Sequence, residues 1–87
     1  MANSAADIGK IFGGVLRRYR NIAGMSQEDL ADSAAVDRTH ISRLERGVQQ
    51  PTLATMIGLA VALGVPAADF VRDTEAEFLG LTRRKRK

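Results

Sequence analysis

Apolar residues recur along this chain at intervals of three and four and hardly ever at two, which is the period of an α-helix rather than a strand. Glycines close the apolar segments, at Gly24, Gly47 and Gly64. Prolines open two of them, at Pro51 and Pro66. The pattern predicts an all-α fold of five short helices with tight connections.

The apolar positions also predict which side of each helix is buried. The first helix carries a stripe of seven such positions: Ile8, Ile11, Phe12, Val15, Leu16, Tyr19 and Ile22. The fourth carries five: Leu53, Met56, Ile57, Ala60 and Leu63. We expect both stripes to face one common core.

Length and composition limit what the chain can be. Its 87 residues suffice for one domain, and the 45% hydrophobic content makes a packed core feasible. The absence of cysteine excludes a disulfide framework, a thiolate zinc site and a thiol nucleophile. Residues 1–9 lack the pattern of a secretory signal, and the weakly polar stretch 53–68 is too short to span a bilayer. We expect a soluble, cytoplasmic protein without membrane contact.

The net charge of +3 is unevenly distributed. The five residues 83–87 are all basic, whereas residues 1–82 hold eight basic and ten acidic side chains. Within residues 10–46 basic side chains outnumber acidic ones by seven to five, so this region is the one suited to a polyanion. For the segment 82–87 we expect a flexible basic tail. We favour non-specific attraction to phosphate as its role over a solubilising end or a partner contact.

Two helices joined by a short turn occupy residues 26–46. Ser26 is a good N-cap residue, and Asp29 stands where a capping box places its acceptor. Asp37 is the expected cap of the next helix, and Val36 can fill the corner between the two. Helices joined so tightly pack at a steep angle, which is how the second helix is presented to a DNA major groove.

The second of these helices, residues 37–46, has one polar side. At about 100° per residue, Ile41 and Leu44 point inward. The exposed side carries Arg38, Thr39, Ser42 and Arg43. Arginine can bond guanine through two hydrogen bonds, and serine and threonine can bond base edges. Taken alone, the arginines are better explained as solvated surface charges, because exposed arginines are common.

Three segments favour the DNA-binding interpretation: "LRRYRNIAGMSQEDLA" (16–31), "VDRTHISRLERG" (36–47) and "PTLATMIGLAVALGV" (51–65). In this order and spacing they resemble the helix-turn-helix domain of the lambdoid phage repressors, Cro and many small bacterial regulators. The third helix is also similar to that of restriction–modification controller proteins. The resemblance implies a compact five-helix lambda-repressor-like domain over residues 1–81.

The resemblance also implies roles for matching positions. Base contacts fall on Arg38, Thr39 and Arg43, with Ser42 as a further candidate. Phosphate contacts fall on Gln27, Arg46, Gln49, Gln50 and Thr52, and Gln27 also braces the recognition helix. His40 lies on the flank of that helix, and we expect it to be a surface or phosphate-facing residue. Arg20 and Glu45 match a partly buried ion pair between the first and third helices. The family usually has glycine where this chain has Ala35, so either Ala35 adopts a left-handed conformation or the turn differs.

The last helix, expected over about residues 66–79, carries candidate dimer contacts. One such domain reads only a few base pairs, and two copies on half-sites about 34 Å apart supply the usual affinity. The candidates are Phe70, Val71, Phe78 and Leu79. The alternative is that these side chains close the monomer core.

We therefore predict a sequence-specific regulator of transcription, foremost a repressor, that binds double-stranded DNA as a homodimer on a palindromic operator. Its partners could include RNA polymerase or another protein. The alternative is an antitoxin-like or other protein-interaction module, favoured if residues 66–87 fold only on a partner. We expect no enzyme activity, cofactor or metal, because His40 is the single histidine and no acid, base and nucleophile converge.

Overall fold

The computed structural model describes the backbone of residues 5–85 and the side chains of residues 7–80. Five helices make up this part of the chain, which holds no strand. They are α1 (Ala5–Ile22), α2 (Gln27–Ala34), α3 (Arg38–Arg46), α4 (Leu53–Leu63) and α5 (Ala67–Lys85). The prediction of an all-α, five-helix domain is confirmed.

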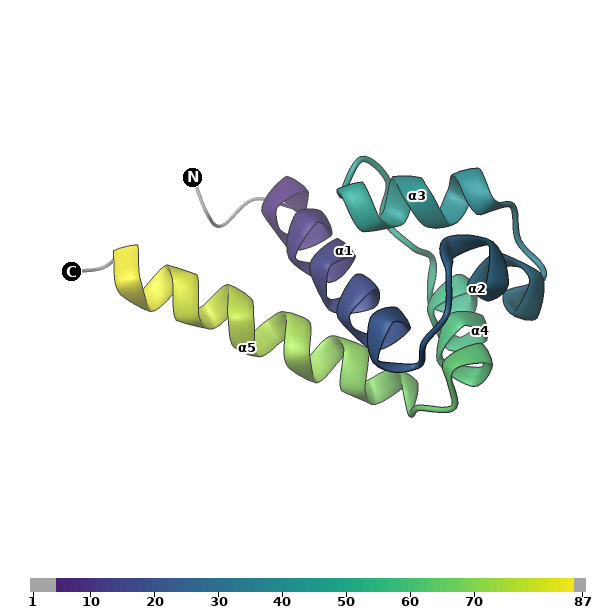
Figure 1. The fold of residues 1–87 in the computed structure, drawn as a ribbon. Helices are drawn as coiled ribbons and strands as arrows, with labels where there is room; N and C mark the ends of the chain where they lie inside the picture. Colours follow the sequence, from purple (N-terminus) through teal and green to yellow (C-terminus); the bar gives the residue numbers. More distant parts are fainter. Residues whose placement is uncertain (1–4, 86–87) are drawn as a thin grey trace.

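Helix α1 occupies the middle of the fold (Figure 1). It packs against α3 on one side and α5 on the other, while α2 contacts α3 and α4. α5 runs back along α1 in roughly the opposite direction, so both chain ends lie at one end of the molecule (Figure 1). α2 and α3 lie on the side of α1 that faces away from α5 (Figure 1). The surface predicted to bind DNA is therefore separated from the surface predicted to bind a second copy.

The helix ends follow the capping residues of the sequence. The Ser26 hydroxyl accepts a hydrogen bond from the Asp29 N–H, and the Asp29 carboxylate accepts one from the Ser26 N–H, which completes the predicted capping box. Thr52 caps α4 by accepting from the Thr55 N–H. Asp37 occupies the N-cap position of α3, but its side chain makes no cap hydrogen bond.

The core is formed where these helices meet. Its largest fully buried side chains include Phe70, Leu16, Leu30, Ile41, Leu44 and Leu59. The Phe70 ring lies edge-on to Phe12 and Tyr19, with centroids 5.8 and 5.3 Å apart. α5 is thereby anchored to α1 by aromatic contacts at its first turn.

The buried sides of two helices differ from the predicted stripes. Leu53 and Ile57 are exposed, at 70% and 47%, and the buried residues of α4 are Leu59 and Ala60. α4 has no charged residue and is apolar on all sides, so the spacing of its apolar residues does not specify one face. Ile22 is also exposed, because it is the last residue of α1 and the chain turns away after it.

Helix α5 is longer than predicted and extends to Lys85, not to about residue 79. Arginine and lysine are good helix formers, and their charge is favourable at the C-terminal end of a helix dipole. The predicted end of the helix is therefore wrong, because residues 82–85 continue it. The flexibility expected of residues 82–87 stays a prediction. Arg86 and Lys87 lie outside the described residues.

Among the described residues no single helix is long and apolar enough to cross a membrane. α4 and α5 would satisfy that criterion only as a pair, and they are bent by 109° at their junction.

Candidate nucleic-acid interface

The turn between α2 and α3 sets the position of the candidate reading helix. Ala35 closes α2 in the left-handed conformation, with φ of 57°, and is the only residue other than glycine with positive φ among those described. The next residue, Val36, donates its N–H to the Ala31 carbonyl at 2.9 Å and packs against the core. The first of the two alternatives for this turn is therefore correct: an alanine adopts the conformation that glycine usually supplies.

Helix α3 presents the polar side that the sequence predicts. Arg38, Thr39 and Arg43 are exposed and Ser42 is half-buried, whereas Ile41 and Leu44 are fully buried. Arg46 is also exposed and His40 is half-buried on the flank of this side. The four candidate base-reading residues thus share one surface of a single helix.

Two side chains of this surface are bonded to each other. The Arg46 Nε donates to the Ser42 hydroxyl at 3.2 Å, one helical turn away. Ser42 keeps its own O–H as a donor, and the outer guanidinium nitrogens of Arg46 remain available to an anion.

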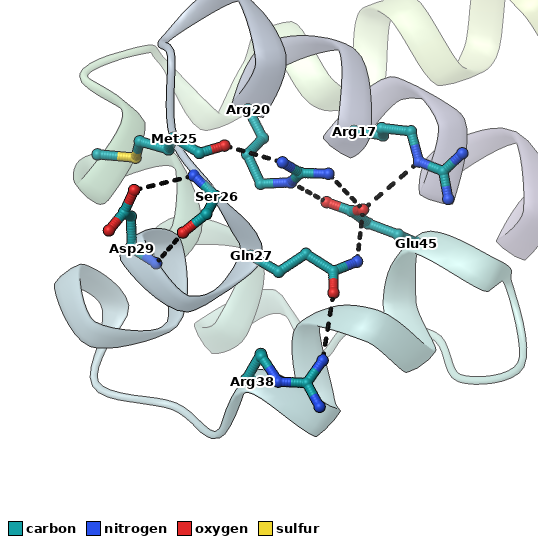
Figure 2. Close-up of polar contacts among 8 residues, drawn as sticks. All are labelled: Arg17, Arg20, Met25, Ser26, Gln27, Asp29, Arg38 and Glu45. Atoms are coloured by element: carbon teal, nitrogen blue, oxygen red, sulfur yellow. Dashed lines mark hydrogen bonds and ion pairs between the residues drawn. The ribbon is translucent and has the colours of Figure 1, made fainter.

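Glu45 lies directly beneath this surface and joins three helices. Its side chain is fully buried, and Arg20 of α1, only 12% exposed, donates to it through Nε at 2.6 Å and Nη2 at 3.0 Å. Gln27 at the start of α2 donates its amide Nε2 to the same carboxylate at 3.0 Å. The predicted ion pair between Arg20 and Glu45 is therefore present, in the two-pronged geometry that arginine favours (Figure 2).

These donors determine the charge state of Glu45. Burial by itself disfavours the carboxylate, but the hydrogen bonds from Arg20, Gln27 and Arg17 outweigh burial and hold the pKa of Glu45 below its ordinary value. Glu45 therefore stays ionised at neutral pH. Its negative charge is offset locally, so the surface of α3 above it keeps its positive character.

Gln27 connects the buried ion pair to the surface of α3. Because its amide nitrogen donates to Glu45, its carbonyl oxygen is turned toward α3, where the Arg38 Nη1 donates to it at 3.5 Å (Figure 2). The resemblance gave Gln27 two roles, a phosphate contact and bracing of the recognition helix, and its two hydrogen bonds to α3 agree with the second. Sequence reasoning missed Arg17, whose Nε lies 3.5 Å from Glu45. The signal for Arg17 was its spacing of three residues from Arg20, which puts both on one side of α1.

The loop between α3 and α4 holds the remaining phosphate candidates. Gln49 and Gln50 are exposed, and Gln50 packs its aliphatic part over Gly9 of α1. The Thr52 hydroxyl caps α4 by accepting from the Thr55 N–H, and it lies 3.0 Å from the Thr55 hydroxyl. Thr52 is exposed, and the phosphate contacts of Gln49, Gln50 and Thr52 stay predictions.

The predicted dimer contacts of α5 divide into two groups. Phe70 is fully buried in the monomer, so its assignment to a dimer interface is wrong: it faces Phe12 and Tyr19. Val71 and Leu79 are exposed, at 53% and 39%, and Phe78 is half-buried. Val71 and Phe78 line an apolar groove of about 350 Å³ between α5, α1 and the loop before α4.

A second polar cluster ties α1 to α5 on the side away from α3. The Tyr19 hydroxyl donates to Asp73, which also accepts from Arg72. These bonds lower the pKa of Asp73, and the bond to Asp73 raises the pKa of Tyr19. Within the described part of the chain no group of three His, Asp or Glu side chains could hold a metal ion.

A short amphipathic helix with an exposed arginine-rich side, set on a preceding helix by a tight turn and fixed by a buried ion pair, defines a helix-turn-helix domain. The chain belongs to the helix-turn-helix family, whose sequence profile matches residues 16–70.

Three relatives illustrate this membership. The control protein C.SmaI of Serratia marcescens is 46% identical over 57 residues, which cover 66% of this chain and 68% of that protein. The HTH-type transcriptional regulator y4dJ of Sinorhizobium fredii is 35% identical over 79% of this chain and 90% of its own. The crystal structure of the restriction–modification controller protein C.AhdI of Aeromonas hydrophila superposes with a TM-score of 0.70, at 37% identity over 75% of this chain and 97% of that one.

Proposed function

We propose that the protein is a transcriptional regulator that binds double-stranded DNA at specific sequences by inserting α3 into the major groove. The observation that carries this proposal is the polar side of α3, where Arg38, Thr39 and Arg43 are exposed together over a rigid, buried support. The helix-turn-helix family and the regulators among the relatives support it.

Each exposed residue has a chemically suitable role in such a complex. Arg38 and Arg43 can each form paired hydrogen bonds with a guanine, and Thr39 and Ser42 can bond or contact neighbouring bases. The phosphate contacts fall to six residues around α3: Gln27, His40, Arg46, Gln49, Gln50 and Thr52. In this arrangement the exposed side of α3 reads the base sequence, and the residues around it position the protein on the DNA backbone.

The regulator acts as a homodimer on a palindromic operator. Val71 and Leu79 leave apolar surface exposed on α5, and Val71 and Phe78 line a groove that a helix of a second copy could enter. Two copies would double the short site that one α3 can read. Repression would follow if the bound dimer covers a promoter and excludes RNA polymerase, and it would take place in the cytoplasm on the nucleoid.

The interaction-module alternative has less support. It is favoured if residues 66–87 fold only on a partner, whereas α5 is helical from Ala67 onward and Phe70 anchors it in the core.

Selection of bound duplexes from a random pool tests the proposal, with wild type and Arg43→Ala in parallel. We expect a palindromic motif from the wild type and a loss of preference at one position per half-site in the variant, worth about 1–3 kcal/mol. Arg72→Ala, on α5, is the matched control and should retain the full motif. Binding without any motif, unchanged in Arg43→Ala, would contradict sequence-specific recognition.

A further inference from the structure

An edge of α1 borders the candidate DNA-reading surface and carries two basic side chains, Lys10 and Arg17, to which no DNA contact has been assigned. Lys10, Gly14 and Arg17 are all exposed and share one side of α1, because they are four and three residues apart. We propose that this α1 edge, with Arg17 as the main ligand, binds a phosphate of the DNA backbone beside α3. The proposal rests on the proposed function and extends its binding surface from α2 and α3 to α1.

The α1 edge lies immediately next to the C-terminal end of α3. Gly13, adjacent to Gly14, is so close that a Cβ there would meet the Glu45 carbonyl oxygen at 2.4 Å. A Cβ on Gly47, the residue that ends α3, would meet the Lys10 side chain at 2.6 Å. A DNA backbone that follows the groove past the end of α3 therefore comes next to α1.

Arg17 is a surplus donor in the cluster around Glu45. Arg20 and Gln27 already supply three hydrogen bonds of 2.6 to 3.0 Å to this carboxylate. Arg17 lies farther away, at 3.5 Å, and its side chain is 55% exposed. The three shorter bonds keep Glu45 paired if Arg17 moves away, so moving Arg17 to a phosphate costs the fold little.

The orientation of Arg17 agrees with this role. Only its Nε faces Glu45, and Figure 2 shows the two outer nitrogens of the guanidinium turned away from the carboxylate. Those nitrogens are the pair that grips a phosphate through two hydrogen bonds. Gly14 leaves the surface between Lys10 and Arg17 bare, with nothing within 4 Å of the position of its missing Cβ, so a phosphate can approach the helix closely.

The neighbouring arginine provides a matched control. Arg18 is also exposed, but it lies near Asp73 and helps to lower the pKa of that carboxyl, which places it on the α5 side of α1. The two residues have the same chemistry and adjacent positions but face different surfaces. A loss of charge at Arg18 should leave DNA binding unchanged.

The test is the salt dependence of binding to two duplexes, one with the selected motif and one of random sequence. Each phosphate that the protein neutralises contributes about 0.9 to the slope of the logarithm of the binding constant against the logarithm of the salt concentration. We expect Arg17→Ala to reduce the slope on both duplexes by about 0.9 for each bound protomer, and to weaken binding at low salt by about 5- to 10-fold for each bound protomer. Arg17→Lys should restore most of the slope, and Arg18→Ala should match the wild type.

The outcomes separate this inference from the proposed function. An unchanged slope in Arg17→Ala, with a motif that still depends on Arg43, would overturn the α1 contact alone. A lower affinity accompanied by a lower melting temperature but the wild-type slope would also overturn it, since a structural role predicts that result. If no motif is selected, the proposed function fails, and the slope on the random duplex still decides whether Arg17 binds phosphate.

Discussion

Glu45 is the residue on which the position of α3 depends. It belongs to α3, yet its carboxylate is held by Arg20 of α1 and by Gln27 of α2. A buried charge without its partners is strongly destabilising, so these bonds permit one relative arrangement of the three helices and penalise others. The same carboxylate orients the Gln27 amide toward Arg38, which links fold stability to the candidate DNA-reading surface of α3.

Replacement of Glu45 by glutamine tests this role through pH. Because the pKa of Glu45 is lowered in the folded protein, its ionised form adds stability that is fully present above the unfolded pKa, about 4.3, and is lost as the pH falls through the folded value. We expect Glu45→Gln to lower the free energy of unfolding by about 3 kcal/mol at pH 7, because it leaves Arg20 buried without its counterion. The measurement is urea unfolding of both proteins from pH 7 to pH 3.

The difference in free energy of unfolding between the two proteins should narrow as the pH falls below about 4.3, because Glu45 of the unfolded wild type then binds a proton while the folded carboxylate is still ionised. Asp29 and Asp73, whose pKa values are also lowered, are present in both proteins and cancel in the comparison. If the difference in free energy of unfolding stays constant down to pH 3, the charge of Glu45 does not contribute to stability.

At the scale of the elements, the crossing of α1 over α3 depends on one glycine of an adjacent pair. A Cβ on Gly13 would lie 2.4 Å from the Glu45 carbonyl oxygen and 2.6 Å from that of Leu44, and neither backbone atom can yield without moving α3. A Cβ on Gly14 would meet nothing within 4 Å. The sequence shows two equivalent interruptions of a helix, but only the packing tells them apart.

Alanine substitutions at Gly13 and Gly14 should therefore have opposite effects on stability. We expect Gly13→Ala to destabilise the protein by about 1–3 kcal/mol, because it forces α1 and α3 apart. We expect Gly14→Ala to stabilise it by about 0.4–1 kcal/mol, because alanine has less backbone freedom to lose and fits the helix. Urea unfolding of the two variants measures both effects, and a loss of similar size in each would refute the close crossing.

Features of the elements that follow local rules were mostly predictable from sequence. The capping box at Ser26 and Asp29 and the inward side of α3 depend on residues a few positions apart, and both are present in the structure, whereas Asp37 stands at the predicted cap position of α3 without a cap hydrogen bond. The buried side of α4 was not predictable, since a helix with no charged residue has no polar side to mark its exposed face. The burial of Phe70 and the contact of Arg17 with Glu45 depend on parts of the chain that are distant in sequence, and the spacing of residue types does not reveal such contacts.

At the scale of the whole molecule, α1 separates two surfaces of different chemistry. On one side α3 presents the cationic side of Arg38, Arg43 and Arg46. On the other side α5 presents apolar side chains beside a groove, together with Asp69 and Asp73. This arrangement lets a second copy bind at α5 without covering α3, as a dimer on two half-sites requires.

The dimer interface can be tested by a charge placed at the groove. Val71 is half-exposed on α5 and lines the groove, so in a two-fold dimer Val71→Asp would bury two uncompensated carboxylates. We expect dimerisation to weaken by about 100-fold or more, which corresponds to about 3 kcal/mol. Sedimentation velocity over a range of concentrations measures this, and affinity for the full operator should fall toward that for a half-site. Ala76→Asp, on the exposed side of α5 away from the groove, should dimerise as the wild type does.

A second variant distinguishes the two apolar surfaces of the molecule. The exposed side of α4 carries Leu53, Ile57 and Val61, and Val61 is 75% exposed. If α5 forms the interface, Val61→Asp should leave the dimer intact, because an exposed side chain outside the contact costs little to change. If instead Val61→Asp yields monomers while Val71→Asp does not, α4 forms the interface and the assignment to α5 is wrong. Both variants keep α3 and its ion pair, so residual binding to a half-site shows that either loss arises from dimerisation and not from unfolding.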